Sequence, residues 1–330
     1  MAVGLEDIKK LRAMTGAGLG DCKKALTEAD GNIDEAIALI RKRGQAVAAK
    51  RSDREAAEGC VLVKAADGFG AMIALKCETD FVAKNADFVQ LAKDILDAAW
   101  TARCKSLEEV KALTLGGMTI AEAVTERSGI TGEKMELDGY FTIEAPCIAT
   151  YNHQNGNMLC TLVGFNKETD EEVRKNIAMQ VASASPVAVD AASVPQEVKD
   201  RELAVAIDKT KEEQVKKAVE AALKKAGYNL YIAENEEHLN EGVMKGEITE
   251  ADAQAIRDLK EKTAAEKAAN LPEQMIQNIA QGRLGKFFKE NCLLEQEYIW
   301  DKTLNVANYL KQSDKELTVT AFHRFTLRAE

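Results

Sequence analysis

Apolar residues at the start of the chain recur every three or four positions, which predicts short helices. Leu5, Ile8 and Leu11 follow this spacing until a Thr-Gly-Ala-Gly sequence interrupts it, and two further apolar stripes follow. The pattern predicts a three-helix bundle over residues 1–45. A bundle of about 40 residues is close to the lower size limit for an independent core. We therefore expect its surface to serve in docking.

The hydrophobic period changes after residues 46–58, a segment rich in Ala, Lys, Arg and Glu that predicts an exposed helical or flexible linker. Apolar residues then alternate at 61–65 and return at 71–77, on either side of an Asp-Gly-Phe-Gly turn, which predicts a β-hairpin. An amphipathic helix is expected next, from Phe88 to Trp100. We assign these elements to a first core subdomain over residues 59–139.

A similar order of elements recurs in the second half of the chain. The tripeptide Glu78-Thr79-Asp80 reappears as Glu168-Thr169-Asp170, each time between a predicted strand and a predicted helix. We interpret this as a duplicated hairpin-plus-helix unit, the second copy covering 140–330. Residues from about 197 to 270 are dominated by Ala, Glu and Lys at helical spacing and predict a helical insertion, a hairpin or an antiparallel coil. The expected fold class is α+β with small antiparallel sheets.

Composition limits the classes of function. The chain has 330 residues, enough for two or three domains, and a net charge of −10, which argues against coating nucleic acid. No apolar run approaches the roughly 20 residues that span a bilayer. The first residues lack the pattern of an export signal, and the seven cysteines are scattered without a C-x-x-C pair. These features predict a cytoplasmic protein with reduced thiols and no membrane association.

Enzyme signatures are missing from the sequence. It contains no P-loop, no dinucleotide-binding glycine motif, no H-E-x-x-H and no nucleophile elbow. We therefore expect neither a cofactor nor a metal site, and we predict no catalytic residue.

The segment Thr79-Asp80-Phe81-Val82 carries the strongest candidate for a binding site. An acidic residue and a large aromatic stand side by side between the strand and the helix, where side chains can point outward from a rigid corner. Two plainer interpretations exist: Thr79 or Asp80 caps a helix, or Phe81 belongs to the core. The second copy of the tripeptide continues with two glutamates and no aromatic. A shared fold therefore does not explain Phe81.

Several motifs occur in an order that is typical of one family. They are Leu11-Arg12-x-x-Thr15-Gly16-Ala17-Gly18, Asp21-Cys22-Lys23-Lys24-Ala25-Leu26, Thr79-Asp80-Phe81-Val82-Ala83-Lys84-Asn85, Tyr151-x-His153, Gly282-Arg283-Leu284, Phe287-Phe288 and Leu293-Leu294-x-Gln296. With these residues the chain resembles the bacterial elongation factor Ts family, nucleotide exchange factors of the GTPase elongation factor Tu. The resemblance covers nearly the whole chain.

The resemblance implies an exchange factor without covalent chemistry. Phe81 would wedge into a pocket of elongation factor Tu and disturb the Mg²⁺ that is coordinated beside the β-phosphate of GDP. Asp80 would make a polar contact next to the wedge, and Thr79 and Val82 would fix the corner. GDP would then leave and GTP would rebind. The bundle would resemble a ubiquitin-associated (UBA-like) domain.

The resemblance also implies partner contacts away from the corner. In some places this chain differs from the pattern of the family. Secondary partner contacts are expected at Leu11, Met14, Gly16, Gly18, Leu19 and Gln180. Many relatives have His where this chain has Gln180, so only a modest role is expected there. A C-terminal helical module carried by some members is expected to be absent, and the insertion is longer than in compact members. No direct nucleic acid contact is implied, while a dimer or a 2:2 complex with the GTPase stays open.

Two other classes of function compete with this interpretation. A UBA-like bundle alone would suggest an adaptor that binds proteins without exchange activity. A thiol enzyme could use Cys77, which stands beside Glu78. A cysteine in a strand, however, usually belongs to the core.

Overall fold

The computed structural model describes residues 3–328, which form two compact units. Within the described residues, the first unit comprises residues 3–189 and 297–328, and the second comprises residues 190–296. The chain is mixed helix and strand, with small antiparallel sheets and a helical N-terminal region, so the predicted α+β class is confirmed.

The first unit begins with three helices around a common core: α1 (Leu5–Thr15), α2 (Leu19–Glu28) and α3 (Ile33–Lys50). Gly16 ends α1 in the left-handed conformation, φ 70°, which is open to glycine at low cost. Asn32 caps α3 by accepting hydrogen bonds from two backbone N–H groups. Helix α3 continues to Lys50, so the expected bundle boundary at residue 45 falls inside a helix.

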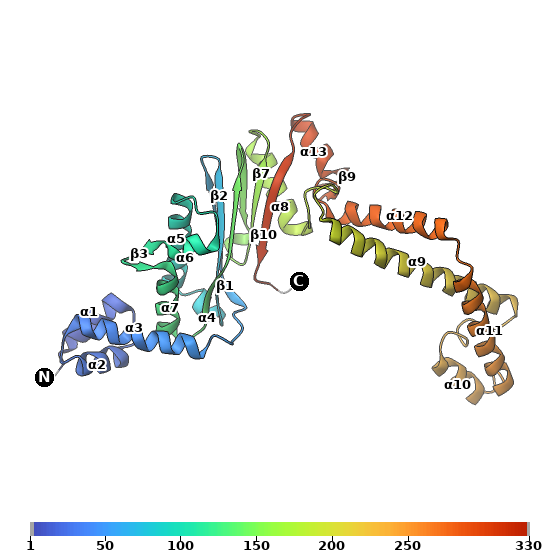
Figure 1. The fold of residues 1–330 in the computed structure, drawn as a ribbon, viewed down its shortest axis with the longest axis horizontal. Coiled ribbons are helices and arrows are strands. Elements are labelled where there is room, and N and C mark those ends of the chain that lie inside the picture. Colours follow the sequence, from blue (N-terminus) through green and yellow to red (C-terminus); the bar gives the residue numbers. More distant parts are fainter. Residues whose placement is uncertain (1–2, 329–330) are drawn as a thin grey trace. The chain divides into compact units, whose positions relative to one another are not determined.

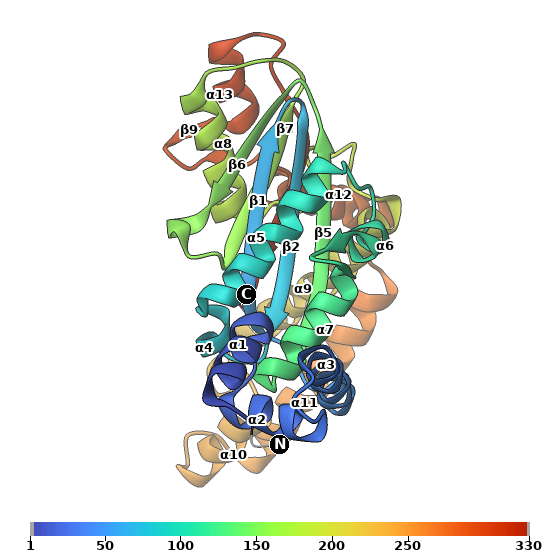
Figure 2. The same cartoon turned by 90° about the vertical axis from the view of Figure 1, so that its left-hand side faces the viewer.

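A three-stranded antiparallel sheet follows, with β2 (Phe69–Cys77) between β1 (Glu58–Ala66) and β5 (Met135–Glu144). One face of this sheet is covered by helices (Figure 2). These elements and the small ribbon beside them are α4 (Asp80–Ala83), α5 (Ala86–Thr101), α6 (Leu107–Ala112), β3 (Thr114–Leu115), β4 (Met118–Thr119) and α7 (Ile120–Thr131).

Strand β5 corrects the predicted boundary between the two core subdomains. Residues from 140 onward were expected to begin the second copy. Tyr140 instead lies opposite Ile73 of β2, so the boundary at 139/140 cuts through a strand of the first sheet. Strand β2 pairs with β1 on one side and with β5 on the other. The first copy therefore extends to Glu144, the last residue of β5.

The second sheet repeats this arrangement, with β7 (Leu159–Phe165) between β6 (Cys147–Asn152) and β10 (Val319–Thr326). The two sheets pack face to face, since Met72 and Ile143 of the first share an apolar cluster with Leu162 of the second (Figure 1). The remaining elements of this copy are η1 (His153–Asn155), α8 (Glu171–Ala184), β8 (Glu297–Tyr298), β9 (Asp301–Asn305) and α13 (Val306–Ser313). In both copies, a hairpin leads into a helix.

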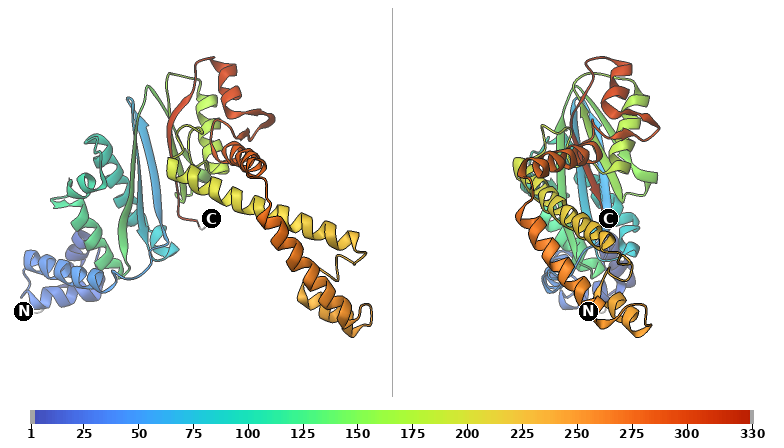
Figure 3. Two further views of the ribbon diagram at one scale, coloured as in Figure 1. Left: turned by 45° about the vertical axis from the view of Figure 1, so that its right-hand side comes forward. Right: turned by 90° about the vertical axis from the view of Figure 1, so that its right-hand side faces the viewer.

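The second unit is a helical insertion in the second copy of the core (Figure 3). Its helices are α9 (Gln196–Lys225), α10 (Glu236–Met244), α11 (Glu250–Ala269) and α12 (Glu273–Asn291). Helix α9 contacts both α11 and α12. The insertion thus extends beyond residue 270, the predicted end, because the helix after Leu271-Pro272 packs back on α9.

Candidate functional site

The corner after β2 is formed by two helix caps placed close together. The side-chain oxygen of Thr79 accepts a hydrogen bond from the backbone N–H of Val82 at 3.4 Å and begins α4. Asn85 caps α5 in the same way, accepting from the N–H of Asp87 at 2.9 Å. Since each cap starts a new helix, the chain turns twice within a few residues. The sequence therefore encodes the bend locally.

Phe81 points away from the protein and is 84% exposed. The interpretation of Phe81 as an ordinary core residue is therefore wrong. Its neighbour Val82 packs against the core of the first sheet, together with Ala83. The short helix thus packs one side, partly buried, against the core and presents a large aromatic ring on the other.

Asp80 is the first residue of α4, and the cap is Thr79, so the alternative in which Asp80 caps the helix is wrong. The carboxylate of Asp80 accepts a hydrogen bond from Lys84 Nζ at 2.7 Å. This hydrogen bond lowers the pKa of Asp80. Beside the exposed ring, the corner therefore carries the negative charge of Asp80, which is paired with Lys84 of the same corner.

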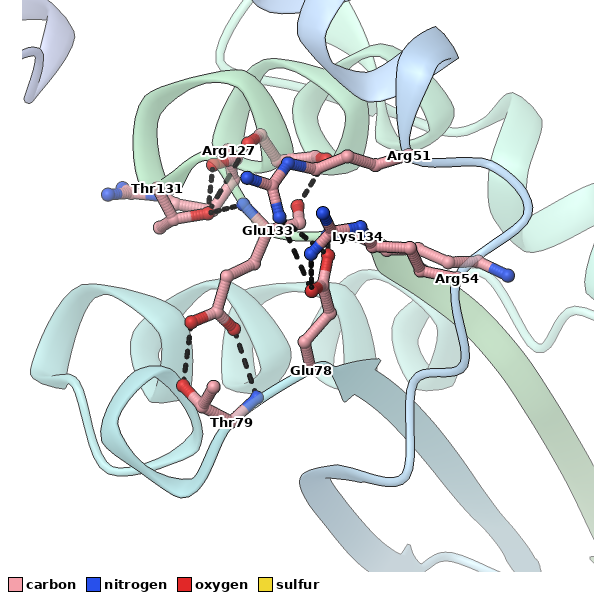
Figure 4. Close-up of polar contacts among 9 residues, drawn as sticks. Arg51, Arg54, Glu78, Thr79, Arg127, Thr131, Glu133 and Lys134 are labelled. Atoms are coloured by element: carbon pink, nitrogen blue, oxygen red, sulfur yellow. Dashed lines mark hydrogen bonds and ion pairs between the residues drawn. The ribbon is translucent and has the colours of Figure 1, made fainter.

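Two carboxylates hold the corner in place, one from the corner itself and one from the segment between α7 and β5 (Figure 4). Glu133 accepts hydrogen bonds from both the N–H and the hydroxyl of Thr79, at 3.0 and 2.6 Å. Glu78 pairs with Arg51 at 3.1 Å and Arg54 at 3.0 Å. Sequence reasoning missed Glu133 and both arginines, because nothing in the local pattern links residues up to 54 positions apart.

The predicted secondary contacts on the bundle divide into exposed and buried residues. Met14 is 56% exposed and Leu19 is 46% exposed, so both are available to a partner. Leu11 is fully buried in the bundle core, and the expected partner contact at this position stays a prediction. Gly16 and Gly18 shape the chain between the first two helices, where they follow α1 and precede α2.

The bundle is joined to the corner's surroundings through Arg127 of α7. A Cβ placed on Gly16 would lie 3.6 Å from an Arg127 guanidinium nitrogen. The same guanidinium group is 3.4 Å from the carboxylate of Asp87 at the start of α5. The loop carrying the predicted bundle contacts therefore lies close to the helix that follows the Phe81 corner.

Gln180 is fully buried in α8 in the chain without a partner, and the expected secondary contact at this position stays a prediction. Its side-chain amide donates to the carbonyl oxygen of Glu297 at 3.2 Å, and its oxygen accepts from the N–H of Ile299 at 2.9 Å. Gln180 thus secures the chain around β8. A polar side chain that is buried in a helix and hydrogen-bonded to a loop has a structural role.

A second exposed aromatic lies near this loop and was not predicted. Trp300 is 60% exposed and lines a cavity of about 400 Å³ together with Tyr151, His153 and Met179. The hydroxyl of Tyr151 and Nδ1 of His153 are 3.0 Å apart, which orients the imidazole. The Tyr-x-His motif thus forms one wall of an apolar hollow in the second copy of the core.

The structure argues against thiol chemistry at Cys77. The thiol is fully buried, and burial, followed by the nearby charge of Glu133, raises its pKa to about 12. A thiol with so high a pKa stays protonated and is a poor nucleophile. Over residues 3–328 we find no group of three or more acidic, histidine or cysteine side chains placed to hold a metal ion. Within the same range, no helix has the length and hydropathy needed to cross a bilayer.

Comparison with known proteins gives a consistent result. Residues 78–329 match a family model described as elongation factor TS. The chain is 61% identical to elongation factor Ts of Bacteroides fragilis over 330 residues, which is 100% of each chain. It is 60% identical to the protein of that name from Phocaeicola vulgatus and 42% identical to that from Porphyromonas gingivalis, again over the full length of both chains.

Proposed function

The chain belongs to the elongation factor Ts family and thus has a role in translation elongation, and we propose that it is the guanine nucleotide exchange factor of elongation factor Tu. In this proposal it binds elongation factor Tu–GDP, displaces Mg²⁺ and promotes release of GDP, after which GTP rebinds. It acts by binding alone and carries out no covalent step. The single observation that supports this most directly is the 84% exposure of Phe81 on a corner that is otherwise firmly held.

The exposed ring of Phe81 is the inserting element. An isolated soluble protein gains nothing from presenting a phenylalanine to water, whereas a partner's pocket removes the ring from water on binding. Asp80 lies next to the ring and supplies a polar contact at the rim of that pocket. Thr79 and Val82 act from behind, as the cap of α4 and as its partly buried contact with the core.

The magnitude of exchange requires more than this ring. Accelerating release by roughly 10⁴ corresponds to about 5.5 kcal/mol of differential binding. A single aromatic hot spot contributes about 2–4 kcal/mol. Other surfaces must supply the difference, and two are exposed: Met14 and Leu19 on the bundle, and Trp300 beside its hollow in the second copy.

Linkage requires that the effect be reciprocal. If the chain weakens the binding of GDP to the GTPase by some factor, GDP weakens the binding of the chain by the same factor. The nucleotide-free complex is thus tight, and incoming nucleotide dissociates it. The proposal also implies a cytoplasmic site of action, since the GTPase works there, with no direct contact to nucleic acid. The net charge of −10 supports the latter point.

The deciding experiment mixes the purified chain with elongation factor Tu–GDP in the presence of EDTA and separates the products by size. We expect a nucleotide-free complex that dissociates when GDP and Mg²⁺ are added. A complex that keeps its GDP, or one that GDP does not dissociate, contradicts the proposal. An adaptor without exchange activity would give the former result.

A further inference from the structure

The Phe81 corner begins where the ladder between β2 and β5 stops. Cys77 is the last residue of β2 and lies opposite Met135, the first residue of β5. Continued by the same register, Glu78 would face Lys134 and Thr79 would face Glu133. The two chains separate there because α4 must begin, so their backbone N–H groups need other acceptors.

The separated chains exchange carboxylates in place of backbone carbonyls (Figure 4). Glu78 accepts the N–H of Lys134 at 2.6 Å, and Glu133 accepts the N–H of Thr79 at 3.0 Å. Each carboxylate thus accepts the backbone N–H of the residue that would lie directly opposite its own in the continued register. Hydrogen bonds to an ionised carboxylate are roughly twice as strong as those between neutral groups, so this junction is stiffer than an ordinary strand end.

Glu133 makes the contact nearest to the ring. Its second oxygen accepts the hydroxyl hydrogen of Thr79 at 2.6 Å, so the carboxylate grips both the backbone and the side chain of that residue. The oxygen of Thr79 in turn accepts the N–H of Val82 and begins α4. Phe81 is the second residue of that helix. The orientation of the ring therefore depends on where Glu133 holds Thr79.

Glu133 is itself fixed to α7. The hydroxyl of Ser128 donates to the carbonyl oxygen of Glu133 at 2.5 Å, and the oxygen of Thr131 accepts the N–H of Glu133 at 3.3 Å. Helix α7 also crosses bundle helix α3 at van der Waals contact of the two backbones. A Cβ on Gly129 would lie only 2.0 Å from the Cα of Gly44. One helix thus connects the bundle to the residue that grips the corner.

The second copy of the core is an internal comparison. There Thr169 occupies the position of Thr79, but its hydroxyl oxygen is buried without a hydrogen-bond partner within residues 3–328. The cap residue of α8, Asp170, makes no side-chain cap hydrogen bond. No aromatic follows it. The pair of hydrogen bonds from Thr79 to Glu133 therefore occurs in the copy that has the exposed ring, and the hairpin-plus-helix fold does not require it.

We propose that Glu133 is a positioning residue for Phe81, acting through Thr79 and tying the ring to α7 and hence to the bundle. This inference rests on the exchange function proposed above. A partner that docks on the bundle then meets the ring at a set distance and angle, so little docking energy is lost in ordering the corner. Glu133 does not touch the GTPase; it sets where the ring arrives.

The test measures release of a fluorescent GDP from elongation factor Tu over a titration of the full chain. We expect Glu133→Ala to lower the maximal release rate by roughly ten- to hundredfold, because small misplacements of a reacting group have effects of that size. The concentration for half-maximal rate should change less than about threefold, since the docking surfaces stay intact. Glu133→Gln should restore much of the rate, because an amide can accept the Thr79 N–H and donate to its hydroxyl oxygen.

A double-mutant cycle distinguishes positioning from a general structural role. If Glu133 acts through the ring, Glu133→Ala has no further effect in a Phe81→Ala background. Glu136→Ala is the matched control: it removes a glutamate three positions further on, whose side chain is 46% exposed and pairs with Lys134. We expect the control to behave as the wild-type chain.

Three outcomes overturn the inference: an unchanged maximal rate in Glu133→Ala, additive effects in the cycle, or an equal loss in Glu136→Ala. Should Glu133→Ala fail to fold, Thr79→Val takes its place in the cycle, since it keeps the branched shape and removes the hydroxyl group.

Hydrogen exchange of the free chain separates this inference from the exchange function. Lost protection of the Thr79 and Val82 amides in Glu133→Ala is expected, and full protection overturns the grip. A wild-type chain that does not accelerate GDP release overturns the exchange function instead.

Discussion

Replacing Phe81 by alanine tests the exchange function at its most exposed point. A phenylalanine side chain contributes roughly 200 Å² of accessible surface. With 84% of Phe81 exposed, a partner's pocket can bury about 170 Å², worth about 4 kcal/mol at about 25 cal/mol per Å². Alanine keeps part of that area, which leaves a loss of about 3 kcal/mol, or roughly a factor of 100. This is an upper figure, since only binding that is stronger without nucleotide accelerates release.

The assay is stopped-flow release of a fluorescent GDP from elongation factor Tu over a range of chain concentrations. We expect Phe81→Ala to slow release by up to about 100-fold. The free energy of unfolding should change by less than about 0.5 kcal/mol, because the ring makes no core contact. A thermal melt of the variant checks this second expectation.

Tyr231→Ala is the matched control, because it removes a ring that is 64% exposed in the helical insertion. We expect this control to leave the release rate unchanged. The reasoning is refuted if Phe81→Ala and the wild-type chain give the same rate at every concentration. It is equally refuted if both ring deletions slow release to the same extent, since the effect would then be one of general hydrophobicity.

Three further predictions concern the framework around the site. Gly129→Ala should lower the melting temperature clearly, since its Cβ would overlap the facing helix, whereas Gly285→Ala in α12, with open space around the Cβ, should be neutral or stabilising. Gln180→Ala should cost about 1–3 kcal/mol in a denaturant titration and speed hydrogen exchange at Ile299, because a buried hydrogen-bond partner is lost. For Glu78, hydrogen bonding to a backbone N–H and then to two arginines lowers the pKa in the folded state. Its contribution to stability is therefore complete above the ordinary glutamate pKa of about 4.3 and is lost as the pH falls through the lower folded value. Glu78→Gln should thus lose less stability than the wild-type chain between about pH 5 and 3 in melts across that range; an identical pH dependence would contradict it.

Local signals correctly predicted the elements that depend on neighbours in sequence. The bundle helices follow from apolar residues three and four positions apart. The bend at the corner follows from Thr79 and Asn85, which cap helices that begin at the next residue. The outward position of Phe81 was also predicted, from its place at a corner between a strand and a helix. These features arise within a few residues, so the order of residues alone specifies them.

Long-range pairing could not be predicted in the same way. The strand that begins at Met135 joins the first sheet and not the second, although both assignments fit its alternating pattern. The family resemblance implied partner contacts at Leu11 and Gln180, and the side chains of both residues are buried. Hydrophobic periodicity says that a side chain is on one face of an element but does not say what covers that face.

The sequence by itself therefore determined the helices, the hairpins, the family and the aromatic that stands at the corner. Only the tertiary structure decided what holds that aromatic in place, because Glu133 comes from another element 54 residues away. The residues around Glu133 in the sequence do not indicate which distant hydroxyl group its carboxylate binds. The two meet because the register between β2 and β5 leaves the residues after Cys77 beside those before Met135, within hydrogen-bonding distance.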